Sequence, residues 1–329
     1  MTTAVLVTIL GGGIALMIPV LWAGLGELIE ESAGIINVGI EGVMLVGAYV
    51  GAQVAQLTSN VVLGLFAGIG IGAACGAILA YLYVYRAVDQ LITGLMFTLM
   101  ALGLTTVLYQ KNPAGTALAG FQVWVIPGVS RIPVVGVVFR QTPLAYFAIV
   151  AAIAVWYGLR HTWLGLYIRA AGQGAQTTAT SGVNVHQVRA VSVIMGCSFI
   201  GLGGAALVLT ETGGFVADVT NDLGFIALAM VMLAGWNALA LIGAAFLFGV
   251  SDAMQYAVQN ISSLAHVPHD LWLSIPYLAT IFVLAITRGR DVPRALGIPF
   301  PVSDQRVRIR LGRVTQSIRR RQESGIRAG

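Results

Sequence analysis

Residues 61–85 read VVLGLFAGIGIGAACGAILAYLYVY, with no charged or amide side chain among them. The hydrocarbon core of a bilayer is about 30 Å thick, and an α-helix crosses it with about 20 apolar residues. A strand of a transmembrane β-barrel would instead alternate apolar and polar residues over segments of about ten. The stretch therefore predicts a membrane-spanning α-helix and excludes a barrel.

The composition of the whole chain points the same way. The 329 residues are 57% hydrophobic and only 9% charged, with a mean hydropathy of +0.87. Soluble domains average about 25% charged residues, which excludes an ordinary soluble protein. We expect an all-α polytopic membrane protein.

Apolar runs between short polar breaks locate the crossings. We expect nine transmembrane helices, with eight to ten left open, near residues 4–26, 35–58, 61–85, 89–110, 143–159, 190–210, 224–236, 238–258 and 271–287. They make one transmembrane domain over residues 1–290, followed by a basic tail over 291–329. A short echo between residues 34–47 and 224–235, running in opposite directions, indicates an inverted repeat.

Arginine placement predicts the orientation in the membrane, because cytoplasmic loops are rich in Lys and Arg. Eleven of the 17 arginines lie between Arg288 and Arg327, which places the C-terminus on the cytoplasmic side of a bacterial-type inner membrane. Residues 160–189 are then cytoplasmic too, and residues 111–143 are external. We expect the basic tail to meet anionic lipid rather than nucleic acid, because it lacks interleaved aromatic residues.

Several chemistries are excluded or disfavoured by residue counts. Lys111 is the single lysine, and it does not stand in a GxxxxGK[ST] phosphate-binding loop, so the chain has no ATPase site of that kind. Cys75 and Cys197 stand alone in predicted helices, and the four histidines form no ligand pattern, so we expect no metal site. No catalytic residue is indicated.

Glycines recur every four residues in the opening stretch and so share one helical face. Such a face lets another backbone approach closely. We expect this face to serve helix packing, through Gly64, Gly68, Gly72 and Gly76.

The second apolar run carries two polar side chains, Asn37 and Glu41, with Gly39 and Gly42 beside the carboxylate. An acidic side chain at a membrane helix centre costs roughly 2.5 to 3.5 kcal/mol, so it should face protein or a wet cavity. Glycines weaken regular helix and permit irregular backbone that lines a cavity. Two roles stay open: lining a cavity, or bonding freed backbone groups.

The break at residues 160–189 is longer than the usual helix connection of about 2 to 8 residues. It contains no acidic residue, and its glycines at 172, 174 and 182 can bracket a short helix on the membrane surface. We expect this segment to dock a partner.

The stretch Glu31–Leu45, reading ESAGIINVGIEGVML, resembles the opening signature of permease subunits of ABC importers for nucleosides and simple sugars. Residues 165–185 resemble the cytoplasmic coupling segment of that family. Residues 213–249 and 276–300 match in order, so the resemblance covers roughly residues 15 to 300.

The resemblance implies that this chain is a permease subunit of an ATP-driven importer. Its partners would be a second permease, identical or different, an ATPase subunit that binds ATP and Mg, and an extracytoplasmic substrate-binding protein. The second run looks closer to nucleoside importers than to branched-chain amino-acid permeases, so a nucleoside is the expected cargo. A monosaccharide or a branched-chain amino acid is the alternative.

The resemblance also names candidate residues. We expect the substrate pathway to include Asn37, Glu41, Phe97 and Thr98. We expect coupling to the ATPase to involve Arg169, Gly172, Gln173 and Gly182. A carrier driven by an ion gradient and an integral-membrane enzyme are the two rival classes. A gradient-driven carrier would more often have ionisable residues in several crossings, whereas Glu41 is the clearest one here. An enzyme would need a nucleophile or a metal constellation, and none is visible.

Overall fold

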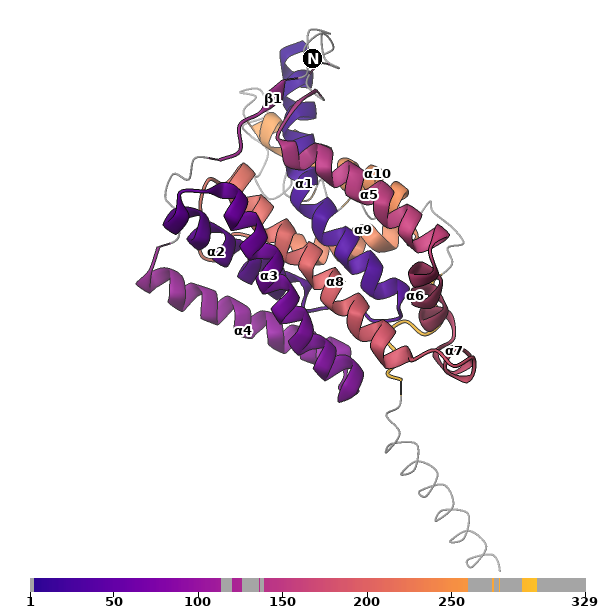
Figure 1. The fold of residues 1–329 in the computed structure, drawn as a ribbon. Coiled ribbons are helices and arrows are strands. Elements are labelled where there is room, and N and C mark those ends of the chain that lie inside the picture. The colour runs from indigo at the N-terminus through magenta and orange to yellow at the C-terminus, as the bar shows by residue number, and fades with distance from the viewer. Residues whose placement is uncertain are drawn as a thin grey trace, which may run out of the picture.

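The computed structural model describes residues 3–113, 120–125, 136, 139–259, 274, 278 and 292–300. This part of the chain is almost entirely helical, which confirms the expected all-α fold (Figure 1). Its elements are α1 (Thr3–Ser32), α2 (Ile40–Thr58), α3 (Val61–Ala80), the π-helix η1 (Tyr81–Tyr85), α4 (Gln90–Lys111), β1 (Trp124–Val125), β2 (Arg140–Gln141), α5 (Pro143–His161), α6 (Trp163–Gln173), α7 (Ala175–Thr180), α8 (Val185–Ala206), the π-helix η4 (Leu207–Glu211), α9 (Leu223–Ala234) and α10 (Ala238–Gln259). The short strands β1 and β2 pair antiparallel.

Seven helical segments of the described chain are long and apolar enough to cross a membrane. They are α1, α2, α3 with η1, α4, α5, α8 with η4, and α10. The expected crossing at 224–236 is α9, which has 12 residues and at 1.5 Å per residue covers about 18 Å, too little to cross alone. The expected crossing at 271–287 lies almost wholly outside the described residues. The count of nine and the inverted repeat stay predictions.

Helix α8 lies at the centre of the bundle, in contact with α1, α2 and α3 (Figure 1). Its glycines make these contacts close. A Cβ on Gly203 would lie 2.9 Å from the carbonyl oxygen of Pro19 in α1, and one on Gly204 would overlap the carbonyl of Met44 in α2. Backbone against backbone is how membrane helices pack when they present small residues.

The four glycines expected on one face of α3 are all buried. Gly68, Gly72 and Gly76 face α8, and Gly64 faces α2. A Cβ on Gly72 would overlap the carbonyl oxygen of Cys197 in α8. The spacing read from the sequence is therefore the spacing of a helix interface.

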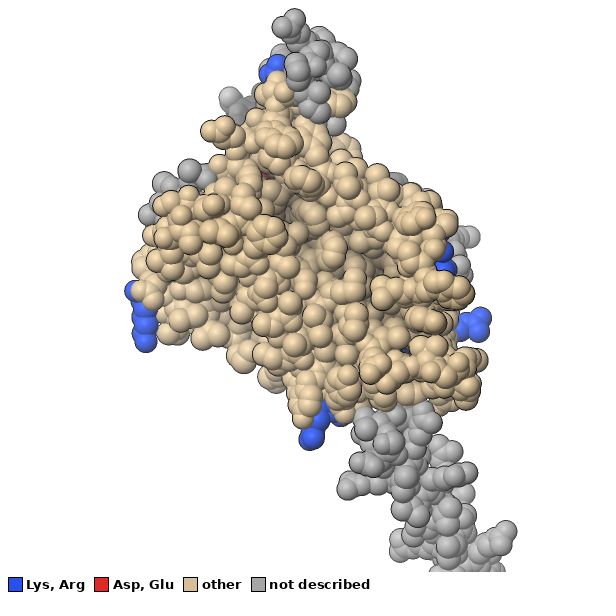
Figure 2. All heavy atoms as spheres, viewed as in Figure 1, with Lys and Arg blue, Asp and Glu red and all other residues tan. Residues whose placement is uncertain are grey.

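The outer surface is largely apolar, and Figure 2 shows charged side chains only at its margins in that view. Large apolar side chains of α3, α4 and α5 are exposed, among them Phe66, Ile78, Leu91, Met96, Leu99, Phe147 and Val150. Exposed apolar surface on this scale needs lipid or another membrane subunit beside it.

Helices α6 and α7 and residues 292–300 lie at one end of the bundle, while the start of α1 and β1 lie at the other (Figure 1). The Ala295 amide donates to the Gly172 carbonyl at 2.8 Å. Residues 160–189 and the start of the C-terminal segment are thus on the same side, as the arginine pattern requires. That this side is cytoplasmic stays a prediction.

Two helix boundaries differ from the sequence expectation. Helix α1 continues to Ser32, so the acidic residues expected in a polar break after residue 26 are helical and buried. Helix α2 begins at Ile40 rather than at residue 35, which leaves Asn37 in the connection between the two helices.

Candidate functional site

The connection between α1 and α2, residues 33–39, is irregular backbone, and it ends at Gly39, whereas Glu41 and Gly42 are helical. Gly34 has a φ of +88°, which a residue with a side chain rarely adopts. The Ile36 amide donates to Oε1 of Gln90, at the start of α4, at 2.9 Å. The connection is therefore held by partners from distant parts of the chain.

Asn37 is completely buried and has a partner for each of its polar groups. Its backbone amide donates to Oε1 of Glu27 at 3.0 Å. Its side-chain oxygen accepts from the Gly39 amide at 3.0 Å and from the Tyr83 hydroxyl at 3.3 Å. Its side-chain amide donates to Sγ of Cys197 at 3.4 Å. Asn37 thus organises the connection from its centre.

Glu27 and Glu30 complete this buried polar cluster, which we call the Asn37 cluster. The Cys197 thiol donates to Oε1 of Glu30 at 3.4 Å. Oε2 of Glu27 and Oε2 of Glu30 have no hydrogen-bond partner among the described residues. No ion pair neutralises either carboxyl in this part of the structure, and no group of three metal-ligating side chains is found there.

Glu41 bonds to a different element, the beginning of α9. Its Oε2 accepts from the Gly224 amide at 2.6 Å, and its Oε1 accepts from the Thr220 hydroxyl. An acidic side chain is stabilised at a helix N-terminus because the first amides lack intrahelical partners. Glu41, 4% exposed, therefore joins α2 to α9.

Asn37 and Glu41 stand four residues apart, as two residues on one helical face would, but they do not share a face, because Asn37 precedes the first residue of α2. The Asn37 side chain bonds to Cys197 of α8 and Tyr83 of η1, whereas the Glu41 side chain bonds to Gly224 of α9. Both are enclosed within the chain.

Phe97 and Thr98, the other two candidates for the substrate pathway, lie where α4 crosses α2. A Cβ on Gly42 would lie 2.8 Å from Cα of Thr98 and 3.1 Å from Cδ1 of Phe97. The Thr98 hydroxyl donates to the Val38 carbonyl at 3.5 Å. The structure brings this pair against the start of α2, within reach of the 33–39 connection, while the outward face of α4 is exposed.

The segment expected to dock a partner contains two short helices, α6 and α7. Thr162 caps α6 by accepting from the Gly165 amide at 3.1 Å. Gly172 lies so close to α1 that a Cβ there would overlap the carbonyl oxygen of Ser32. Gly182 follows α7 with a φ of +87° and open space around it. One glycine serves a close approach and the other a turn.

Arg189 joins this segment to the rest of the molecule by hydrogen bonds. In the sequence it is only the last residue of the 160–189 break, which we expected to be cytoplasmic. It is 1% exposed. Its guanidinium donates to the carbonyls of Ala33 at 3.1 Å, Ile298 at 2.9 Å and Ala171 at 3.5 Å. Ala33 and Ala171 stand at the C-terminal ends of α1 and α6, where a cation is favoured.

We call these contacts the Arg189 junction: Arg189, Gly172, and the backbone of Ala33, Gly34 and residues 295–298. The Gly297 amide donates to the Gly34 carbonyl at 3.1 Å, beside the bond from Ala295 to Gly172. The ends of α1, α6 and α8 and the C-terminal segment are thereby joined at one point.

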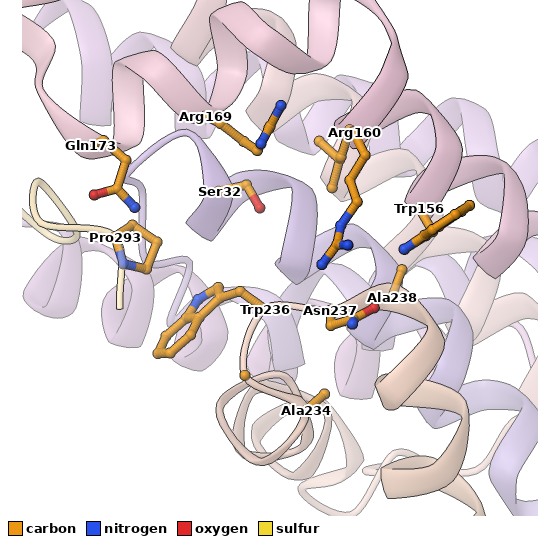
Figure 3. Close-up of a pocket in the computed structure, with 12 residues that line it drawn as sticks. Ser32, Trp156, Arg160, Arg169, Gln173, Ala234, Trp236, Asn237, Ala238 and Pro293 are labelled. Atoms are coloured by element: carbon orange, nitrogen blue, oxygen red, sulfur yellow. The ribbon is translucent and has the colours of Figure 1, made fainter. Parts of the chain in front are cut away.

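Arg169 and Gln173, the other two coupling candidates, do not join this junction. Both line a hollow between α5, α6 and the turn from α9 to α10 (Figure 3). The sequence analysis also missed the acidic residues of α1. Their signal was their spacing of three and four residues, which places Glu27, Glu30 and Glu31 on one side of a helix.

The geometry defines an integral-membrane protein: a helical bundle with an apolar outer surface, in which the α6–α7 segment is bonded to the connection between α1 and α2. The chain belongs to the family described as the permease component of branched-chain amino acid transport systems, which matches residues 9–284. This finding confirms the resemblance read from the sequence.

Three ABC transporter permeases match this chain over more than nine tenths of their own length. A putative glucose ABC transporter permease of Haloferax volcanii is 36% identical over 85% of this chain and 91% of its own length. A nucleoside ABC transporter permease of Lactococcus lactis is 32% identical over 86% and 93%. A guanosine ABC transporter permease of Bacillus subtilis is 29% identical over 86% and 92%. No solved structure matches the chain significantly. The chain is an ABC transporter permease.

Proposed function

We propose that this permease imports a nucleoside, with the energy supplied by a partner ATPase that binds ATP and Mg. An extracytoplasmic binding protein would deliver the cargo, and a second permease, identical or different, would complete the pathway. The observation that carries the coupling part of the proposal is the Arg189 junction. It bonds the α6–α7 segment directly to the connection that holds Asn37.

Coupling requires that movement at the ATPase reach the pathway through a continuous contact. Helix α7 extends from the same end of the bundle as residues 292–300, and we assign this end to the cytoplasm. A shift of α6 would displace Ser32, because the backbone of Gly172 packs directly against the Ser32 carbonyl with no side chain between them. It would also pull on Ala33 through Arg189. Gly182 would let α7 turn into α8, and Gln173 would border the docked ATPase.

The pathway would run beside Phe97 and Thr98, where α4 lies against the start of α2. Asn37 and Glu41 would act indirectly, by holding the 33–39 connection and α9 in place. An uncharged solute suits this arrangement, because the only charged group among the four candidates, Glu41, already accepts from Gly224 in α9 and from Thr220 just before it.

The cargo proposal rests on two relatives whose names specify nucleoside and guanosine. A monosaccharide is the second candidate, favoured by the glucose permease at 36% identity. Nucleosides and monosaccharides share a hydroxyl-bearing sugar ring, so the pathway would meet similar polar groups in either case.

Vesicle uptake separates these cargoes. The permease would be reconstituted with its ATPase and binding protein. Labelled guanosine, uridine, glucose and leucine would be offered with ATP, without ATP, and with an ion gradient in place of ATP. We expect ATP-dependent uptake of a nucleoside and none of glucose. Uptake of glucose or a branched-chain amino acid alone would reject the nucleoside, and uptake driven by an ion gradient without ATP would reject the coupling.

Coupling is tested by Gly172→Ala, with Gly103→Ala as the matched control, because a Cβ on Gly103 meets nothing within 4 Å. We expect Gly172→Ala to insert into the membrane and bind the ATPase while cargo-stimulated ATP hydrolysis falls at least several-fold. The control should behave as the unmodified protein. Equal stimulation in the two variants would remove Gly172 from the coupling path.

A further inference from the structure

A polar hollow of about 470 Å³ lies beside the α6 helix, outside the Asn37 cluster and the Arg189 junction (Figure 3). Its walls come from α5, α6, the end of α1 and the turn between α9 and α10. Trp156 and Arg160 contribute from α5, Arg169 from α6, and Trp236 and Asn237 from the turn.

The hollow is positively charged. Figure 3 shows the Arg160 and Arg169 side chains on its wall, from two different helices. Neither forms an ion pair within the described part of the chain. Arg160 lies over the Trp156 ring, with its guanidinium carbon 5.8 Å from the ring centroid. Two guanidinium groups without a counter-ion attract an anion, and their planar donor forks match the oxygens of a phosphate.

The neutral groups of the hollow also suit an acceptor-rich ligand. Oδ1 of Asn237 accepts from the Leu239 amide at 3.0 Å, which leaves the amide NH₂ as the group to offer. The indole N–H of Trp236 already donates to Oε2 of Glu31, a residue that is 1% exposed and does not line the hollow. An anion would therefore meet donors.

The position of the hollow selects the kind of anion. Ile153 and Tyr157 of α5 are exposed apolar residues on the outer surface. Arg160 follows them on the same side of the helix, seven residues after Ile153, which is two turns further on. A long apolar face that ends in tryptophan and arginine marks the depth at which hydrocarbon gives way to headgroups.

We propose that this hollow binds the phosphate of an anionic phospholipid headgroup, with the acyl chains along the exposed face of α5. Basic pockets between transmembrane helices bind such headgroups in this way. The lipid would join α5 to α6 through Arg160 and Arg169 and so steady the segment that docks the ATPase. An acidic side chain of the ATPase is the competing occupant, but it would leave the continuity with the lipid-facing surface of α5 unexplained.

The test uses the full-length chain in neutral detergent, with phosphatidylglycerol, phosphatidylcholine or inorganic phosphate added, and binding measured by native mass spectrometry. We expect phosphatidylglycerol to bind at least tenfold more tightly than phosphatidylcholine. The double variant Arg160→Gln with Arg169→Gln should lose at least tenfold in affinity for phosphatidylglycerol. Arg86→Gln is the matched control, because Arg86 is an exposed arginine at the end of η1 and outside the hollow.

Three outcomes would overturn the proposal. The first is equal phosphatidylglycerol binding by the double variant and by the Arg86→Gln control. The second is binding of inorganic phosphate as tight as that of the lipid, which would mean a site for a free anion. The third is a double variant that binds lipid normally but fails to co-purify with the ATPase, which would return Arg169 to the coupling surface. None of these results depends on the cargo, so the nucleoside proposal stands or fails separately.

Discussion

Glu41 offers the sharpest test of how this membrane core is held together, because its two oxygens bond two identified donors. Replacing it with leucine removes both acceptors and leaves the Gly224 amide and the Thr220 hydroxyl buried without them. Each buried donor left unsatisfied costs about 1 to 3 kcal/mol. We therefore expect Glu41→Leu to lower the free energy of unfolding by about 2 to 6 kcal/mol.

Glu41→Gln separates charge from hydrogen bonding. The amide oxygen can still accept from Gly224, and the Thr220 hydroxyl can rotate to accept from the new NH₂ group. What is lost is the favourable charge at the start of α9, worth about 0.3 to 2 kcal/mol. We expect the order of stability to be Glu41, then Gln, then Leu, with Thr220→Val between the wild-type protein and the leucine variant.

The assay is the fraction of monodisperse protein that survives a heating series, followed by transport with the variants that assemble. A double variant, Glu41→Gln with Thr220→Val, measures whether the two positions act together, since neighbours in one bond network give non-additive effects. Leucine at position 41 with unchanged stability would refute the packing argument. Normal assembly of the glutamine variant with lost transport would instead show that the charge serves the pathway.

Two further predictions test the ends of the molecule. Single cysteines at Gln176 and Gln316 should be shielded from an impermeant thiol reagent in intact cells while one at Asp218 reacts, and labelling of either glutamine position from outside would reverse the orientation. Arg189→Met should lower the free energy of unfolding by about 2 to 4 kcal/mol. Two hydrogen bonds from a charged donor, at 3.1 and 2.9 Å, are lost, while the cost of burying the charge is recovered in part. A melting curve equal to that of Arg86→Met would contradict this.

The sequence was sufficient to predict those features that depend on local pattern. The length and uniformly apolar character of residues 61–85 predicted a crossing. The four-residue spacing of Gly64 to Gly76 predicted a packed face, because residues at that spacing share one side of a helix. The glycines at 174 and 182 likewise predicted a short helix between them, and α7 is there, with α6 before it. That the segment docks a partner stays a prediction.

Features that depend on distant partners could not be read in this way. Glu27 and Glu30 look like the polar end of a helix until Asn37 and Cys197 are placed against them. Arg189 looks like a surface arginine in a cytoplasmic break until three backbone carbonyls from separate segments surround it. In each case the deciding contact joins residues far apart in sequence, which no local pattern records.

The Arg189 junction and the Asn37 cluster lie at the two ends of one short connection, and this suggests how the permease couples its parts. The Ala33 carbonyl accepts from Arg189, and only four residues later Asn37 bonds to Glu27 and Cys197. This connection is short and bonded near both ends, and Gly34 within it has a positive φ. It therefore has little freedom to absorb a displacement. Movement of α6 must therefore either shift the start of α2 or break the junction. Under the proposed coupling, the first outcome would open or close the bundle beside α4, whereas the second would uncouple ATP hydrolysis from transport.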